Sequence, residues 1–412
     1  MKTAKYIIRR CFAAFVLLLA ACVALPAQVG QTYAERMDTA RKLYQGGAFY
    51  AAEQAFEALA ASADAGYALR RSEIEAYRIL CAIALDRPNV KGHLKDFAEQ
   101  YPTAPELPMV RFTLAGRYFD QGAYDEALAI YDCLSAKELY RAWRGEFTFK
   151  KSFCQMKATR YDEAAAGFGK LSSGRHNVYK YPSLYYLGYV NYLQKHFELA
   201  YTQFVQSAAD SRFRLMSQYY QVECRFMLKD YPYVTANGPG LLDTLEADLQ
   251  SNMLRMISES YYGAGDAESA RRYMEMYMGS GTEVTRKDHY LSGIIAYNLQ
   301  AWDDAVAEFG YVTRLKDTLA QNAFYYIGDA QLLSGNKIAA IGSFRSAAEA
   351  GFDPVITEDA FFNYAKLSFD VNGDIAPFRQ YMQDYPLSGR DDEINRYIAA
   401  AFILDKDYGQ AI

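Results

Sequence analysis

One phrase that returns along the chain constrains its fold more than any other feature of the sequence. Residues 301–310 read AWDDAVAEFG, residues 123–132 read AYDEALAIYD, and residues 160–169 read RYDEAAAGFG. Alignment on the shared alanine gives positions that recur every 34 to 37 residues, apart from one interval of 41. Such a period is typical of solenoids built from pairs of helices. The aligned positions, here called the anchor column, are Ala52, His93, Ala127, Ala164, Ala200, Val234, Ala270, Ala305, Ala340, Pro377 and Ala411.

Two further columns keep this register, although neither was used to set it. A small residue on the first helix of a pair allows the second helix to approach, and an aromatic residue one turn after the anchor is expected to fill the space between one pair and the next. Twelve residues before the anchor, ten of eleven residues are small: Ala40, Cys81, Ala115, Ser152, Gly188, Val222 (the exception), Ser258, Gly293, Gly328, Ala365 and Ala399. Four residues after it, eight of ten are aromatic: Phe56, Phe97, Tyr131, Phe168, Phe204, Phe309, Phe344 and Tyr381.

Short turns are predicted between the two helices of each pair, as in DQGAYDEA and GAGDAESA, where glycine supplies a positive φ. Paired acids follow these turns at residues 125–126, 162–163 and 303–304. In the first turn of a helix, carboxylates interact favourably with the helix dipole. Because the pair recurs from copy to copy, we interpret it as helix-terminal chemistry and not as a catalytic acid and base, which need two different environments.

The column set resembles the tetratricopeptide repeats from about residue 32 onward, with the best copies at Ala127, Ala164, Ala200, Ala305 and Ala340. The resemblance implies an all-α, right-handed α-solenoid of tandem antiparallel helix pairs. Residues 28–412 would form a single solenoid of about ten repeats and a partial eleventh. His93, Val234 and Pro377 depart from the pattern, so these copies are expected to pair less regularly. The last copy places Tyr408 and Ala411 on a second helix, only about one turn before Ile412. Because solenoids need polar capping elements, we expect the sequence to be the amino-terminal part of a longer array.

The start of the chain resembles an export signal. A cationic segment precedes an apolar run from Cys11 to Leu25, and a small-residue site follows at Ala27. We therefore predict a signal peptide over residues 1–27 and export to the periplasm or the periplasmic face of the outer membrane. An alternative stays open, because LAAC ending at Cys22 resembles a lipobox and makes Cys22 the candidate lipidation residue. No other stretch is long and apolar enough to span a bilayer, so no transmembrane span is expected in the mature chain.

Composition and motifs argue against several classes of function. The formal net charge is −5 and no clustered basic stripe is present, which argues against a nucleic-acid partner. The sequence carries no phosphate-binding, dinucleotide-binding or nucleophile-elbow motif, and its four histidines lack metal-ligand spacing. We therefore expect no enzyme, no cofactor and no metal. Four cysteines are scattered singly and are expected to pack as small core residues, although pairing in an exported protein stays open: Cys81, Cys133, Cys154 and Cys224.

Family members bind segments of other proteins on the concave face that their first helices line. Two columns on these helices, three residues before and four after the small column, are rich in aromatic residues, which supply contact area at low entropic cost. An alternative is that these rings only pack between adjacent first helices. Asn252 and Arg255 are the only hint of a clamp for a terminal carboxylate. The candidate partner-binding residues are Phe112, Phe119, Phe149, Phe153, Tyr185, Tyr189, Tyr192, Tyr219, Phe226, Tyr262, Tyr290, Tyr297, Tyr325 and Phe362.

The sequence as a whole resembles the long exported repeat proteins of the Gram-negative envelope. It predicts a non-catalytic scaffold that holds a protein or peptide segment against an aromatic face. The alternative function is that of a glycan-binding or nutrient-uptake lipoprotein of the outer membrane. Proteins of that type interrupt their repeats with a large irregular domain, and no interval in this array exceeds 41 residues.

Overall fold

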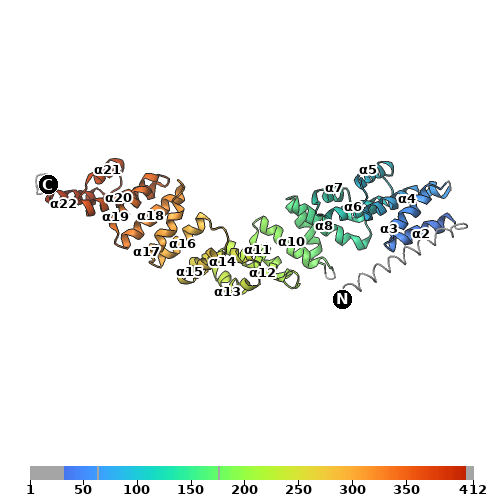
Figure 1. Cartoon of the computed structure of the whole chain (residues 1–412), viewed down its shortest axis with the longest axis horizontal. Helices are drawn as coiled ribbons and strands as arrows, with labels where there is room; N and C mark the ends of the chain where they lie inside the picture. The colour runs from blue at the N-terminus through green and yellow to red at the C-terminus, as the bar shows by residue number, and fades with distance from the viewer. Residues whose placement is uncertain (1–31, 63–64, 175–176, 405–412) are drawn as a thin grey trace, which may run out of the picture. The chain divides into compact units, whose positions relative to one another are not determined.

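The computed structural model describes residues 32–62, 65–174 and 177–404, and every regular element in these ranges is a helix (Figure 1). The chain divides into two compact units, Met1–Ser207 and Ala208–Ile412, which are treated separately below. The predicted signal segment, Cys22, Tyr408 and Ala411 lie outside the described residues.

The first unit consists of five helical hairpins in sequence. Between its third and fourth pairs, the connection contains two short 3₁₀ helices, η2 (Ala136–Glu138) and η3 (Arg141–Trp143). The pairs are α2 (Tyr33–Gln45) with α3 (Phe49–Ala60), α4 (Ala65–Ala84) with α5 (Val90–Gln100), α6 (Leu107–Asp120) with α7 (Tyr124–Tyr131), α8 (Arg144–Lys157) with α9 (Tyr161–Ser172), and α10 (Lys180–Leu193) with α11 (Phe197–Ser207).

The second unit repeats the same plan with five pairs and one further helix, α22 (Asp391–Leu404). Its first pair has a short second helix that continues into η4 (Pro239–Thr244). The pairs are α12 (Arg214–Met227) with α13 (Tyr231–Asn237), α14 (Ala247–Gly263) with α15 (Ala267–Met278), α16 (Arg286–Asn298) with α17 (Trp302–Val312), α18 (Thr318–Leu333) with α19 (Lys337–Ala350), and α20 (Pro354–Asn372) with α21 (Ala376–Asp384).

The three sequence columns meet in the core of each unit, which confirms the all-α arrangement of helix pairs. The anchor alanines within the described residues are fully buried, and every residue of the aromatic column is buried. A Cβ added at Gly293 would lie 2.8 Å from the ring of Phe309, and one added at Gly328 would lie 3.0 Å from Phe344. The aromatic residue therefore packs directly on the small residue of its own pair. Phe309 also stacks on Tyr326 of the next first helix, at 5.4 Å between ring centroids, so it fills the space between pairs as predicted.

The second pair departs from the anchor pattern at His93. Its second helix, α5, buries Val90, Leu94 and Phe97, while His93 is exposed. An imidazole buried at the anchor position would lose its hydration. In α5 the imidazole stays exposed, and Val90, Leu94 and Phe97 make the contact with the core. A cavity of about 360 Å³ opens beside His93 between α3, α4 and α5. The predicted anchor was therefore wrong in this copy. Val234 and Pro377, by contrast, are buried like the alanines.

The turns show a further regularity that the sequence columns did not reveal. In eight of the ten pairs the residue five positions before the anchor has a positive φ. Glycine occupies it four times, as predicted for Gly122 and Gly265, and residues with side chains occupy it in the other four: Thr159, Lys195, Lys229 and Gln300. The paired acids follow in the first helical turn of α7, α9 and α17, which confirms their predicted place.

The described cysteines are all free thiols, and three of them are buried as predicted. Cys81, Cys154 and Cys224 lie on separate first helices, and burial raises the pKa of the Cys81 and Cys154 thiols to about 12. Cys133 is exposed just after α7, which corrects the expectation that it packs in the core.

Candidate functional site

Three of the fourteen candidate aromatic residues are not available as contact surface. Phe112, Tyr219 and Phe362 are at most 8% exposed, because local features of their copies cover them. Trp143, from the long connection between α7 and α8, stacks on Phe112 with 5.3 Å between ring centroids. The guanidinium of Arg390 lies 4.3 Å from the ring centroid of Phe362. These three assignments are corrected to core positions.

Tyr219 is held by the two residues that had suggested a carboxylate clamp. The side-chain amide of Asn252 donates to the Tyr219 hydroxyl at 2.6 Å, and Arg255 donates to the Asn252 carbonyl oxygen at 3.1 Å. Arg255 also pairs with Glu259 at 3.3 Å and lies over the ring of Phe226. Their polar atoms thus bind one another within unit 2, and the structure gives no support to a clamp.

The other eleven candidate residues are half-buried, and in unit 2 several of them serve the fold. Tyr297 on α16 donates to Asp329 on α18, the next first helix. Tyr325 donates to Asp359 on α20 at 2.5 Å, and Arg390 donates to the same carboxylate at 2.8 Å. Burial raises the pKa of Tyr290 to about 12. Tyr262 packs against the core clusters of its neighbours. These tyrosines therefore tie one first helix to another.

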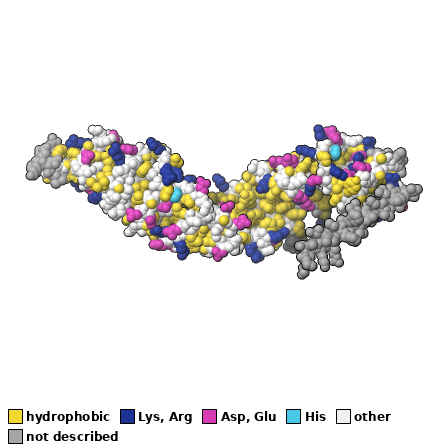
Figure 2. Space-filling view, viewed as in Figure 1, with side chains coloured by type: hydrophobic (Ala, Val, Ile, Leu, Met, Phe, Trp, Pro, Cys, Tyr) yellow, Lys and Arg dark blue, Asp and Glu magenta, His cyan; other side chains and the backbone are white. Residues whose placement is uncertain are grey.

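Unit 1 brings six candidate residues together on three neighbouring first helices. Helix α6 packs against α8, and α8 packs against α10. This set, called the aromatic face below, consists of Phe119 on α6, Phe149 and Phe153 on α8, and Tyr185, Tyr189 and Tyr192 on α10. Figure 2 shows hydrophobic side chains gathered over this part of the molecule.

Ring-to-ring contacts join the three first helices of the aromatic face, and Tyr186 on α10 links Phe153 to Tyr185. Phe119 meets Phe153 edge to face at 5.4 Å, and Phe153 meets Tyr186 at 5.0 Å. Tyr186 lies 5.3 Å from Tyr185, and Tyr189 stacks on Tyr192 within α10 at 6.4 Å. Such pairs stabilise their arrangement beyond the area they bury. The half-exposed rings are therefore held in place before any partner arrives.

The members of the aromatic face differ in how deeply they are anchored. Tyr185 packs against Phe204 at 5.8 Å, and burial raises its pKa to about 12. Tyr189 and Tyr192 lie in the last two turns of α10, and Tyr192 meets Phe197 across the turn to α11. Truncation of Tyr185 would therefore disturb packing within unit 1. Tyr189 also packs against the core of α8 and α9, so variants of these tyrosines need a folding control.

Charge separates the two kinds of helix in this part of unit 1. The first helices α8 and α10 carry five cations and one acid, namely Arg144, Lys150, Lys151, Lys157, Lys180 and Glu146. The second helices α7, α9 and α11 carry five acids and one cation, namely Asp125, Glu126, Asp162, Glu163, Glu198 and Lys170.

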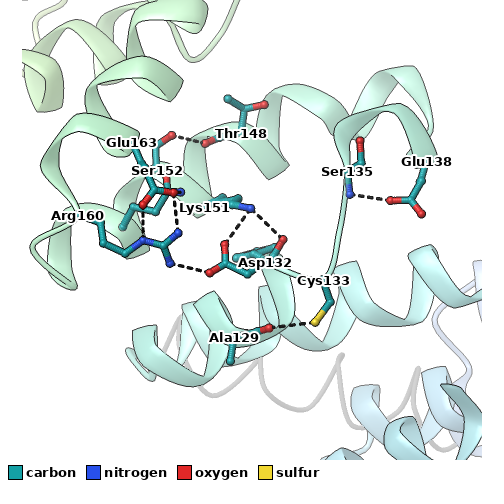
Figure 3. Close-up of polar contacts among 12 residues, drawn as sticks. Ala129, Asp132, Cys133, Ser135, Glu138, Thr148, Lys151, Ser152, Arg160 and Glu163 are labelled. Atoms are coloured by element: carbon teal, nitrogen blue, oxygen red, sulfur yellow. Dashed lines mark hydrogen bonds and ion pairs between the residues drawn. The ribbon is translucent and has the colours of Figure 1, made fainter. Parts of the chain in front are cut away.

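Lys151 on α8 is bound in an ion-pair network with carboxylates of the neighbouring helices. Lys151 binds Asp132 at 2.9 Å, and Arg160 joins Asp132 to Glu163 at 2.6 Å each, which links α7, α8 and α9 (Figure 3). Although burial opposes it, the hydrogen bonds from Arg160 and Lys151 lower the pKa of Asp132. Lys151 thus helps to join the helix pair α6–α7 to the helix pair α8–α9.

Two lysines lie against the rings of the aromatic face. Lys150 is 5.1 Å from the Phe119 centroid and also pairs with Asp120 and Glu146 at 3.0 Å each. Lys157 is exposed and lies 5.7 Å from the centroid of Phe153. The face thus presents aromatic rings with ammonium groups beside them, a combination that suits a ligand with both apolar and anionic groups.

In the described part of the chain, no group of three or more histidine, cysteine, aspartate or glutamate side chains could hold a metal ion. Among the described helices, none combines the length and the apolar character needed to cross a membrane.

The repeated glycine–aromatic contact and the left-handed turn residue define an α-solenoid of helix pairs that resemble tetratricopeptide repeats. In sequence, no family model and no curated protein matches the chain. In structure, it is similar to the C-terminal part of a TPR repeat-containing protein from Cytophaga hutchinsonii, with 15% identity and a TM-score of 0.39, over 65% of this chain and 98% of that one.

Two further solved structures show the same kind of similarity. A tetratricopeptide repeat protein from Parabacteroides merdae matches with 12% identity and a TM-score of 0.28, over 81% of this chain and 99% of that one. A signal-transduction ATPase from Pyrococcus horikoshii, which has a tetratricopeptide repeat sensor, matches with 10% identity and a TM-score of 0.41, over 79% of this chain and 54% of that one.

Proposed function

We propose that this protein is a non-catalytic scaffold of the bacterial cell envelope that binds a segment of a partner protein on the aromatic face of unit 1. The observation that carries the proposal is the series of half-buried rings along α6, α8 and α10. Rings that are fixed beforehand lose little entropy on binding, which is why aromatic residues dominate the energetics of protein interfaces.

The chemistry of the face specifies the kind of segment. Lys157 adds positive charge beside the ring of Phe153, and the helices α8 and α10 together carry five cations against one acid. A segment with apolar anchors and carboxylates between them meets both features. The envelope location rests on the cationic and apolar start of the chain, and the pairing of a periplasmic partner with this face is part of the proposal.

Site-specific photo-crosslinking in cells tests this function. A photoreactive phenylalanine analogue placed at Tyr189 samples the aromatic face, and the same analogue at Leu199 on α11 samples an exposed second-helix position, 55% accessible. We expect one envelope protein to be captured from position 189 and not from position 199. Equal capture from both positions, or capture from neither, would contradict the proposal.

Purified components then measure the contribution of the rings. The double variant Tyr189→Ala/Tyr192→Ala should weaken binding of the captured partner at least tenfold while the far-ultraviolet spectrum stays unchanged, since removal of interface anchors costs about 1–4 kcal/mol. Tyr189→Phe/Tyr192→Phe is the matched control and should keep most of the affinity. Binding of soluble oligosaccharides that survives competition by the partner peptide would favour the glycan-binding alternative.

A further inference from the structure

The connection between α7 and α8, residues 132–143, is the longest between successive helix pairs in the described part of the chain. Hydrogen bonds and burial hold it in a fixed shape. The backbone N–H of Ser135 donates to Glu138 at 2.7 Å. The guanidinium of Arg144 donates to the carbonyl oxygen of Leu139 at 3.1 Å, and the Leu139 side chain is buried in the core of unit 1. Side chains that project from this connection therefore have defined positions.

Two aromatic side chains project from the end of this connection. Tyr140 is 67% exposed, and its ring meets Trp143 edge to face with 5.0 Å between centroids. Trp143 is half-buried, because its ring also lies on Phe112. A third ring, Tyr77 on α4, is half-buried nearby. Burial raises the pKa of Tyr77, Arg41 opposes the rise, and Tyr140 adds to it, as expected for neighbouring phenols.

The set of Tyr77, Tyr140 and Trp143, called the aromatic corner below, shares no residue with the aromatic face. Among the described residues, none forms a hydrogen bond with the indole N–H of Trp143 or with the hydroxyls of the two tyrosines. In unit 2, by contrast, Tyr297 and Tyr325 donate their hydroxyls to carboxylates of neighbouring first helices. An indole N–H can only donate, and a tyrosine hydroxyl can donate as well. The corner thus offers apolar rings together with hydrogen-bond donors.

The donors of the corner discriminate between the backbone conformations of a bound segment. An α-helix satisfies its own carbonyl groups, and a β-strand brings N–H groups that need acceptors. A polyproline II segment has no internal hydrogen bonds, so its carbonyl oxygens are free to accept, and its prolines bring no N–H. Its side chains repeat every three residues, which places successive pyrrolidine rings on one side. The conformation also exists before binding, so that little entropy is lost.

We propose that the aromatic corner binds a proline-rich segment of a partner protein in the polyproline II conformation. Pyrrolidine rings pack on Tyr140 and Trp143, and carbonyl oxygens of the segment accept hydrogen bonds from the indole N–H and the tyrosine hydroxyls. The corner is a second binding site of unit 1, and it does not depend on the function proposed for the aromatic face.

A fluorescence-anisotropy titration of the full chain tests this site. The probe is fluorescein-labelled decaproline, and its control is a labelled peptide of the same length with alternating glycine and serine. We expect saturable binding of decaproline, at least tenfold tighter than that of the control. Equal binding of the two peptides would overturn the proposal. Unlabelled maltohexaose serves as a competitor, and displacement of decaproline by this sugar would overturn the proposal in favour of a glycan site.

Variants locate the peptide on the chain. Tyr140→Ala should weaken decaproline binding at least tenfold, and the far-ultraviolet spectrum should stay unchanged because this ring is mostly exposed. Trp143→Phe keeps a ring on Phe112 and removes the donor, so it should weaken binding about two- to tenfold. Tyr50→Ala on α3, at a tyrosine that is 62% exposed and outside the corner, is the matched control and should bind as before. Wild-type affinity in Tyr140→Ala would overturn the assignment.

Tryptophan fluorescence gives a local readout, because the chain has two tryptophans. In Trp302→Phe, the emission of Trp143 should change when decaproline is added. In Trp143→Phe, the remaining Trp302 lies in unit 2 and its emission should stay constant. The folded variant Tyr189→Ala/Tyr192→Ala should bind decaproline like the wild type, which separates the corner from the aromatic face. An unchanged emission of Trp143, or loss of decaproline binding in that double variant, would contradict the proposal.

Discussion

The contact between Gly293 on the first helix of a pair and Phe309 on the second allows a quantitative prediction of stability. In Gly293→Ala the new methyl group would lie 2.8 Å from two ring carbons of Phe309, closer than a relaxed carbon–carbon contact. Phe309 is fully buried and touches Tyr290 and Tyr326, so its ring has no room to withdraw. Overpacking of this kind costs about 1–3 kcal/mol, and the better helix propensity of alanine returns only about 1 kcal/mol.

A second helical glycine of the same unit provides the control. Gly342 on α19 has nothing within 4 Å of an added Cβ, so Gly342→Ala should stabilise unit 2 by about 1 kcal/mol. The two variants should therefore differ by about 2 kcal/mol in free energy of unfolding, or about 4–8 °C in melting temperature for a unit of this size. If Gly293→Ala is as stable as Gly342→Ala, the contact does not determine how closely the two helices pack.

The assay can follow unit 2 by itself because the chain has two tryptophans, one in each unit. Trp302 lies at the start of α17 against Tyr297, and Trp143 lies in unit 1. In a Trp143→Phe background, urea unfolding followed by the fluorescence of Trp302 reports the second unit.

Two other outcomes test the fold at single residues. His93→Ala should change the free energy of unfolding by less than about 0.5 kcal/mol, whereas Leu94→Ala should lower it by about 2–5 kcal/mol, because Leu94 is buried in the core and His93 is exposed. Urea titration measures both values. A larger loss of stability in His93→Ala than in Leu94→Ala would restore His93 as the anchor. Hydrogen bonds from Arg286 and from backbone N–H groups lower the pKa of Asp317 to about 2. The stabilising effect of the Asp317 carboxylate is therefore complete above the ordinary aspartate pKa of about 4 and is lost as the pH falls through about 2. Carbon-detected NMR titration should find the pKa of Asp317 raised in Arg286→Gln, and an unchanged pKa would contradict the pairing.

Periodicity in the sequence was enough to predict the pairs, because three columns are dictated by contacts that every copy repeats. Gly328 must be small since Phe344 covers it, and this requirement is visible in any copy. His93 marked a copy that was expected to pair less regularly, but the column rule counts positions and did not show that Leu94 would lie in the core while His93 stays exposed. The sequence pattern also could not show which of the candidate aromatic residues are exposed enough to contact a partner. Phe112 is covered by Trp143 from an irregular connection, a contact that exists in one copy alone among those described.

Sequence reasoning also gave no hydrogen-bond partners for the tyrosines. Tyr325 and Asp359 are 34 residues apart, close to one period, and a polar residue at that distance from each tyrosine would have been a usable signal. Tyr219 and Asn252, 33 residues apart, follow the same relation.

The contact between Gly293 and Phe309 joins two residues only 16 positions apart, and Gly328 and Phe344 repeat it at the same separation. Each segment of about 35 residues therefore carries both halves of its own closure. A gene duplication or deletion that spans one such segment adds or removes a complete module, and the remaining modules keep their internal contacts. The number of modules in such an array can therefore change without the need for a new core each time.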